Sequence, residues 1–131
     1  MNGIELPVFI PGDRGTGRTT RLLELVAEDQ EGDPEMVALI VSPYYYRADS
    51  HLSREVMAYI HRWIDGKPGI DPQRTECWSA SALLHKVRGM RQSSARLYVD
   101  DAPEFEDGKL HRLLIECQRS GISLRAMVVG P

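Results

Sequence analysis

The sequence has few cysteines and no long apolar run. Its two cysteines, Cys77 and Cys117, lie far apart and match no metal-ligand spacing, so we expect free thiols in a reducing compartment rather than a disulfide framework or a zinc site. No apolar run approaches the roughly 18 residues that a membrane-spanning helix requires. The N-terminal segment MNGIELP lacks the basic region and apolar core of a secretory signal. These absences predict a soluble, cytoplasmic protein with no membrane partner.

An excess of positive charge is absent as well. The 131 residues carry a formal net charge of −3, which argues against a protein that binds nucleic acid because it is basic overall. The charge is unevenly distributed, however, since no acidic residue occurs between Cys77 and Val99. The basic side chains of that segment could contact phosphates, or could form an ordinary solvated helix face. They are His85, Lys86, Arg88, Arg91 and Arg96.

Apolar runs alternate with helical patterns along the chain, with no internal repeat and no long linker. The expected strands are 6–10, 36–41, 75–78, 96–101 and 124–129, and the expected helices are about 17–28, 52–63, 80–87 and 108–120. Continuous apolar strands separated by helices indicate βαβ units and a parallel sheet that is covered on both faces. We therefore expect a single α/β domain over 1–131, a three-layer sandwich with a mostly parallel five-stranded sheet. Pro7 predicts that the first strand begins after it, and Trp63 and Trp78 are expected in the core.

A glycine-rich segment lies where the first expected strand turns into the first expected helix, and it reads GDRGTGRTT. Gly12, Gly17 and Thr19 fit the first, sixth and last fixed positions of the phosphate-loop pattern G-x-x-x-x-G-K-[ST]. Small residues let backbone N–H groups converge on phosphates, and the helix that follows adds its free amides. Thr19 would offer its hydroxyl to Mg²⁺. The candidate nucleotide-binding residues are Gly12, Gly15, Thr16, Gly17, Arg18, Thr19 and Thr20.

Arg18 stands where the phosphate-loop pattern has lysine. Lysine is a compact point charge, whereas arginine is a planar fork of different reach. Nucleotide binding tolerates this change better than hydrolysis does, because the charge of the transition state needs a correctly placed cation. The alternative interpretation is a glycine-rich turn that binds nothing.

Two acids end the fourth expected strand, whose sequence is LYVDD. Carboxylates at the carboxyl end of a parallel strand project into the crevice where such sheets bind ligands. Asp100 is therefore the candidate magnesium residue. The alternative is an acidic surface turn, which explains Glu104, Glu106 and Asp107 but not the apolar strand before Asp100.

In this order the motifs resemble the phosphate-loop NTPase superfamily on its additional-strand, recombinase-like side, and most narrowly the first motor domain of superfamily 1 helicases. Helicase motif I is resembled by PGDRGTGRTTRLL, and motif II by LYVDDAPEF. The other matches are loose: motif Ia with LIVSPYYYRAD, motif Ib with ECWSASALLHKVRG and motif III with SLRAMVVGP. The resemblance implies ATP or another NTP with Mg²⁺ as cofactors and a DNA or protein partner. It puts Arg18 and Asp101 in catalytic positions, with Asp101 as a base that is one methylene shorter than the glutamate of most hydrolytic relatives.

The sequence departs from the helicase pattern at its end: motif III of the family continues with an aspartate and a glutamine beyond the glycine, whereas this sequence stops at Gly130 and Pro131. We therefore expect no second motor domain, and an arginine finger would have to come in trans from a homo-oligomer. The first interpretation is an Mg-ATP-binding domain that is at most a slow ATPase. The second is a degenerate helicase-like module that engages a protein partner. A nucleoside kinase is the third, weakened because the sequence has no zinc-binding C-x-x-C pairs.

Three consecutive tyrosines, Tyr44, Tyr45 and Tyr46, follow the second expected strand beside Arg47. They could stack on nucleobases, or one or two of them could pack under the next helix. We favour packing.

Overall fold

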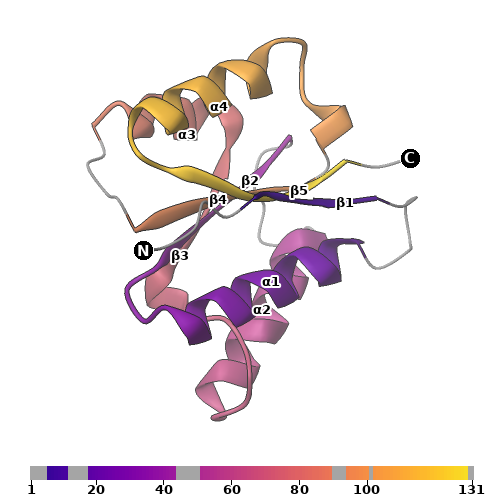
Figure 1. The fold of residues 1–131 in the computed structure, drawn as a ribbon. Helices are drawn as coiled ribbons and strands as arrows, with labels where there is room; N and C mark the ends of the chain where they lie inside the picture. Colours follow the sequence, from indigo (N-terminus) through magenta and orange to yellow (C-terminus); the bar gives the residue numbers. More distant parts are fainter. Residues whose placement is uncertain (1–5, 12–17, 44–50, 90–93, 101, 130–131) are drawn as a thin grey trace.

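The computed structural model describes residues 6–11, 18–43, 51–89, 94–100 and 102–129. It shows an α/β fold in which a five-stranded, all-parallel sheet lies between two layers of helices (Figure 1). The strands are β1 (Val8–Ile10), β2 (Val37–Ser42), β3 (Thr75–Ser79), β4 (Ala95–Val99) and β5 (Ser123–Val128). The helices are α1 (Arg18–Gly32), α2 (His51–Ile64), α3 (Ala80–Val87) and α4 (Lys109–Arg119), with 3-10 turns at Pro72–Arg74 and Ala102–Glu104.

The strand order across the sheet is β1-β5-β4-β2-β3. Helices α1 and α2 cover one face, and α3 and α4 cover the other (Figure 1). The α/β class, the parallel sheet and the helices on both faces are therefore confirmed. β1 begins at Val8, directly after Pro7, as the missing N–H of proline predicts.

The core has two parts because successive strand residues point to opposite faces of the sheet. In β2, Ala38 and Ile40 pack under α1 and α2, whereas Leu39 and Val41 pack under α3 and α4. All four are fully buried. Burial on both faces explains why this strand is a continuous apolar run rather than an alternating one.

Helix α1 is longer than expected and reaches Gly32, four residues past the predicted end at 28. Its last turn is held by tertiary contacts that the sequence pattern does not reveal. Arg74 Nη1 donates to the carbonyl oxygens of Asp33 at 2.9 Å and Gln30 at 3.4 Å, and so satisfies the free carbonyls at the end of the helix. The buried Gln30 side chain donates to Arg74 O and accepts from Asp71 N, both at 2.9 Å.

The prediction of a buried Trp63 is wrong, and that of a buried Trp78 holds in part. The side chain of Trp63 is 43% exposed. Residues 61–68 are all exposed, so the last turn of α2 extends past the core. Trp63 follows the buried Val56 and Tyr59 at helical spacing on α2, but at this end of the helix there is no core for its side chain to pack against. Trp78 is partly buried against the core under α3 and α4.

A cluster of charged side chains lies between α1 and the sheet, and sequence analysis missed it. Asp29 Oδ2 accepts a hydrogen bond from Tyr98 Oη at 2.6 Å and one from Arg125 Nε at 2.7 Å. Arg96 lies 3.8 Å from the same carboxylate and 3.9 Å from Asp33. For Arg96 the sequence left open a contact to phosphates or a place on a solvated helix face, and the structure instead places it on β4, beside Asp29 and Asp33.

Arg125 reaches Asp29 from an irregular position in the sheet. Leu97 pairs with Leu124 and Tyr98 pairs with Ala126, so Arg125 is the extra residue of a β-bulge. A bulge redirects the side chain of the unpaired residue. The register shift therefore lets the charged side chain of Arg125, on β5 inside the sheet, contact Asp29 of α1.

Candidate site at the carboxyl edge of the sheet

The candidate site lies where the parallel strands end. The chain leaves β4 toward α4 on one face of the sheet and leaves the neighbouring β2 toward α2 on the other face (Figure 1). Ligands of open α/β sheets bind in the crevice at such a switch point. Asp100 directly follows β4, and its N–H donates to Val41 O of β2 at 2.9 Å. Asp100 is thus fixed at the carboxyl end of β4, beside β2.

Thr19 and Asp100 are brought together although 81 positions separate them in the sequence. Thr19 lies in the first turn of α1, and its Oγ1 donates to Asp100 Oδ1 over 3.3 Å. Both side chains are partly buried. A hydroxyl and a carboxylate oxygen at this separation are ligand types that Mg²⁺ accepts, directly or through water. The two predicted magnesium residues therefore meet in the structure.

The first turn of α1 faces this edge without an acidic residue of its own. Arg18 is the first residue of the helix, and the partly buried Thr20 follows Thr19. Helix N-termini present free N–H groups and positive dipole ends, so an anion here would meet no competing carboxylate within that turn.

The remaining predicted site residues lie outside the described residues. These are Gly12, Gly15, Thr16, Gly17 and Asp101, and the three tyrosines at 44–46 lie outside them too.

Ser42 is a residue at the same edge that sequence analysis passed over. It is the last residue of β2, it is buried, and it pairs with Ser79, the last residue of β3. Ser79 Oγ accepts a hydrogen bond from Ala82 N at 3.3 Å and so caps α3. A hydroxyl residue at the end of a predicted strand was the available signal for Ser42.

A metal ion at this edge would need ligands beyond protein side chains. In the part of the chain that the structure describes, no three His, Cys, Asp or Glu side chains gather to hold a metal. Mg²⁺ usually keeps several waters and takes one or two carboxylates together with substrate phosphates. A Thr19–Asp100 pair fits that sparse donor set, and a protein cage for zinc does not.

A pocket of about 320 Å³ lies at the opposite end of α1 from Thr19. Its lining residues are Ala27, Gln30, Glu31, Trp63, Gly66, Lys67, Pro68, Gly69 and Arg74. Gln30 and Arg74 are occupied by the hydrogen bonds that close α1, so this pocket belongs to the packing of that helix end.

The chain matches no model of a protein family, no curated protein and no solved structure with which it was compared. Among the described residues, no helix is long and apolar enough to cross a membrane.

Proposed function

We propose that this chain is a phosphate-loop domain that binds Mg-ATP, or another NTP, at the carboxyl edge of its sheet and is at most a slow ATPase. The observation that carries the proposal is the hydrogen bond from Thr19 Oγ1 to Asp100 Oδ1. The pattern G-x-x-x-x-G-x-T and the strand-terminal aspartate are two separate local patterns. Thr19 and Asp100 lie 81 positions apart in the sequence, and neither pattern by itself requires the other to lie beside it.

The strand order supports the same proposal. β5 lies between β1, which leads into the glycine-rich loop, and β4, which ends at Asp100. The resemblance to the additional-strand class implies an extra strand in the sheet, and β5 is available for that place. The carboxyl end of β1 and the acid after β4 then share one edge, because all five strands are parallel.

Each proposed residue has a distinct part in binding. The glycines at 12, 15 and 17 let backbone N–H groups approach the phosphates, together with Thr16, Thr20 and the N-terminus of α1. Thr19 and Asp100 hold the magnesium ion, whose charge offsets that of the phosphates.

Slow turnover follows from two residues. Arg18 replaces the compact cation of the pattern with a planar fork. Asp101 is the base in this proposal, and its side chain is one methylene shorter than the usual glutamate. These two residues also favour a second candidate function, a helicase-like module that binds a protein partner without hydrolysis. Tight Mg-ATP binding with no release of phosphate would favour that second function.

A pair of substitutions at Thr19 tests the proposed site. Thr19→Ala removes the hydroxyl, and alanine suits a helix, so the fold should persist. We expect Thr19→Ala to weaken Mg-ATP binding by roughly 10- to 100-fold, as loss of metal-site groups does. Thr19→Ser keeps the hydroxyl and should bind nearly as the natural chain does. Binding is measured by titration of a fluorescent ATP analogue at saturating Mg²⁺.

A repeat of the titration in EDTA separates loss of the metal from damage to the protein, because Thr19→Ala should match the natural chain there. Equal Mg-ATP affinity of Thr19→Ala and the natural chain would remove Thr19 from the site.

A further inference from the structure

Ser42 lies in register with Asp100 at the ends of two neighbouring parallel strands. Val41 of β2 pairs with Val99 of β4, so the next residues along the two chains are Ser42 and Asp100. The hydrogen bond from Asp100 N to Val41 O, at 2.9 Å, keeps the two chains side by side at this point. Neighbouring strands lie about 4.8 Å apart, which brings the two side chains within reach of each other, directly or through one water.

The side chains of Ser42 and Asp100 also lie on the same face of the sheet. Ile40 pairs with Tyr98, and both side chains pack in the core under α1 and α2. Because side chains alternate along a strand, Ser42 and Asp100, each two residues further on, face that same layer. The contact of Asp100 with Thr19 of α1, at 3.3 Å, agrees with this placement.

Ser42 is more deeply buried than the two predicted magnesium residues. It is 8% exposed, whereas Thr19 and Asp100 are partly buried. Its backbone is held extended, because Pro43 follows and the residue before a proline is restricted to that conformation. This depth favours a place behind the Asp100 carboxylate rather than in the path of an entering ligand.

The chemistry of a buried hydroxyl suits such a place. Buried polar groups need hydrogen-bond partners, and the described residues leave no buried side-chain N or O atom without one. A serine hydroxyl has one donor and two acceptor positions, so Ser42 can serve Asp100 together with another partner. A carboxylate accepts about four hydrogen bonds, so Thr19 and Ser42 can act on Asp100 at the same time.

We propose that Ser42 is a positioning residue, whose hydroxyl donates to the Asp100 carboxylate and holds it in the orientation that Mg²⁺ needs. This inference rests on the proposed function, because it concerns the same magnesium-nucleotide site. Groups that orient a metal-ligating carboxylate contribute to metal affinity although they do not touch the metal. Ser42 would therefore act on the magnesium dependence of nucleotide binding rather than on contacts with the nucleotide.

Ser79 offers a matched control for Ser42. It ends β3 and pairs with Ser42, so it is the same residue type at the same edge, one strand further from Asp100. Its hydroxyl accepts a hydrogen bond from Ala82 N at 3.3 Å and caps α3. Ser79→Ala should therefore lower the melting temperature through loss of the cap and leave the magnesium dependence unchanged.

The test is a titration of the full chain with Mg²⁺ in the presence of a fluorescent ATP analogue at fixed concentration. The readout is the free Mg²⁺ concentration that gives half-maximal binding of the analogue. We expect Ser42→Ala to raise this concentration by roughly 10- to 100-fold, as loss of groups that orient metal ligands does. In EDTA, Ser42→Ala should bind the analogue as the natural chain does, which separates loss of the metal from damage to the protein.

A conservative variant separates positioning from packing. Ser42→Thr keeps the hydroxyl but adds a methyl group at a buried position, so it should melt at a lower temperature. It should nevertheless keep most of the magnesium dependence of the natural chain, whereas a role in packing alone would change both together. Where Ser42→Ala does not fold, Ser42→Cys carries the test, because a thiol is a weak donor and should also raise the half-maximal Mg²⁺ concentration.

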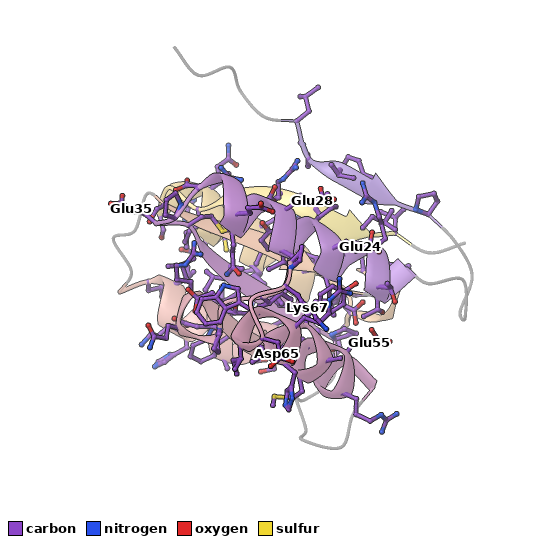
Figure 2. The ribbon with its side chains drawn as sticks, turned by 90° about the horizontal axis from the view of Figure 1, so that it is seen from below. Glu24, Glu28, Glu35, Glu55, Asp65 and Lys67 are labelled. Atoms are coloured by element: carbon purple, nitrogen blue, oxygen red, sulfur yellow. The ribbon has the colours of Figure 1, made fainter. Side chains whose placement is uncertain are left out.

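Magnesium bound elsewhere does not affect the comparison. Glu24 and Glu28 are exposed on the α1/α2 side of the molecule, which Figure 2 shows from below. Any Mg²⁺ that these carboxylates attract is common to all the variants, since none of them changes an acidic residue. A difference between Ser42→Ala and Ser79→Ala therefore reports on the edge of the sheet.

Three outcomes would overturn the role of Ser42: an unchanged half-maximal Mg²⁺ concentration in Ser42→Ala, an equal rise in Ser79→Ala, or an equal rise in Ser42→Thr. Each of them leaves the magnesium-dependent binding of the natural chain in place. Failure of the natural chain to bind the analogue, or binding without regard to Mg²⁺, would overturn the proposed function and this inference with it. The two kinds of failure are therefore distinguishable.

Discussion

At the scale of single residues, Asp29 shows how one side chain can organise a helix and two strands. It lies on α1 with only 9% of its side chain exposed, and it meets Tyr98 of β4 and Arg125 of β5. A buried carboxylate is costly unless it is paired and hydrogen-bonded, and here a hydroxyl and two guanidinium groups satisfy it. The cluster therefore fixes α1, and with it Thr19, relative to the strands.

Replacing Tyr98 by phenylalanine should lower stability in a pH-dependent way. Burial, and then the hydrogen bond to Asp29, raise the pKa of Tyr98 well above its ordinary value near 10. The loss of a hydrogen bond to a charged group should cost about 1.5–3 kcal/mol of unfolding free energy at pH 7. The measurement is urea denaturation of both proteins at pH 7 and above pH 10.

The sign of the pH effect follows from the raised pKa. Above pH 10 the unfolded chain releases the Tyr98 proton while the folded chain keeps it. The stability that Tyr98 contributes is therefore fully present below pH 10 and is lost as pH rises further. The difference between the natural chain and Tyr98→Phe should shrink in alkali, and a constant difference would contradict this cause.

At the scale of elements, the strands were predictable and the contacts between elements were not. The apolar run at 36–41 became β2 because a strand buried on both faces is continuously apolar. The short candidate at 75–78 became β3, a partly buried strand at the edge of the sheet. The end of α1 was placed too early because Arg74 and Gln30, which close it, are distant in sequence. The bulge at Arg125 and the pairing of Arg96 with Asp29 likewise depend on the tertiary arrangement.

The approach of the chain to α2 depends on the absence of a side chain at Gly69. A Cβ there would lie 2.3 Å from the Tyr59 carbonyl oxygen and 2.6 Å from the Trp63 nitrogen, both backbone atoms. Ile70 N also donates to Tyr59 O at 3.1 Å, so this contact fixes the turn after α2. Gly69→Ala should therefore destabilise the protein by about 1–3 kcal/mol, as overpacking does.

The matched control for this substitution is Gly32→Ala at the end of α1, where a Cβ would meet nothing within 4 Å. That variant should be neutral or slightly more stable. The melting temperatures of both variants decide the point, and equal temperatures would show that Gly69 is not under packing constraint.

At the scale of the whole molecule, the topology determines which predicted residues can act together. The glycine-rich segment and the strand-terminal acid were recognisable from the sequence because each has a local pattern. Their meeting depends on the strand order, with β5 between β1 and β4 and all strands parallel.

Titration of the natural chain with a fluorescent ATP analogue, with and without Mg²⁺, tests the proposed nucleotide site most directly. Thr19 and Asp100 offer oxygen ligands for the metal, so we expect micromolar binding in Mg²⁺ that weakens markedly in EDTA. Absence of binding at millimolar nucleotide, or binding that is indifferent to Mg²⁺, would contradict a magnesium-nucleotide site at this edge of the sheet.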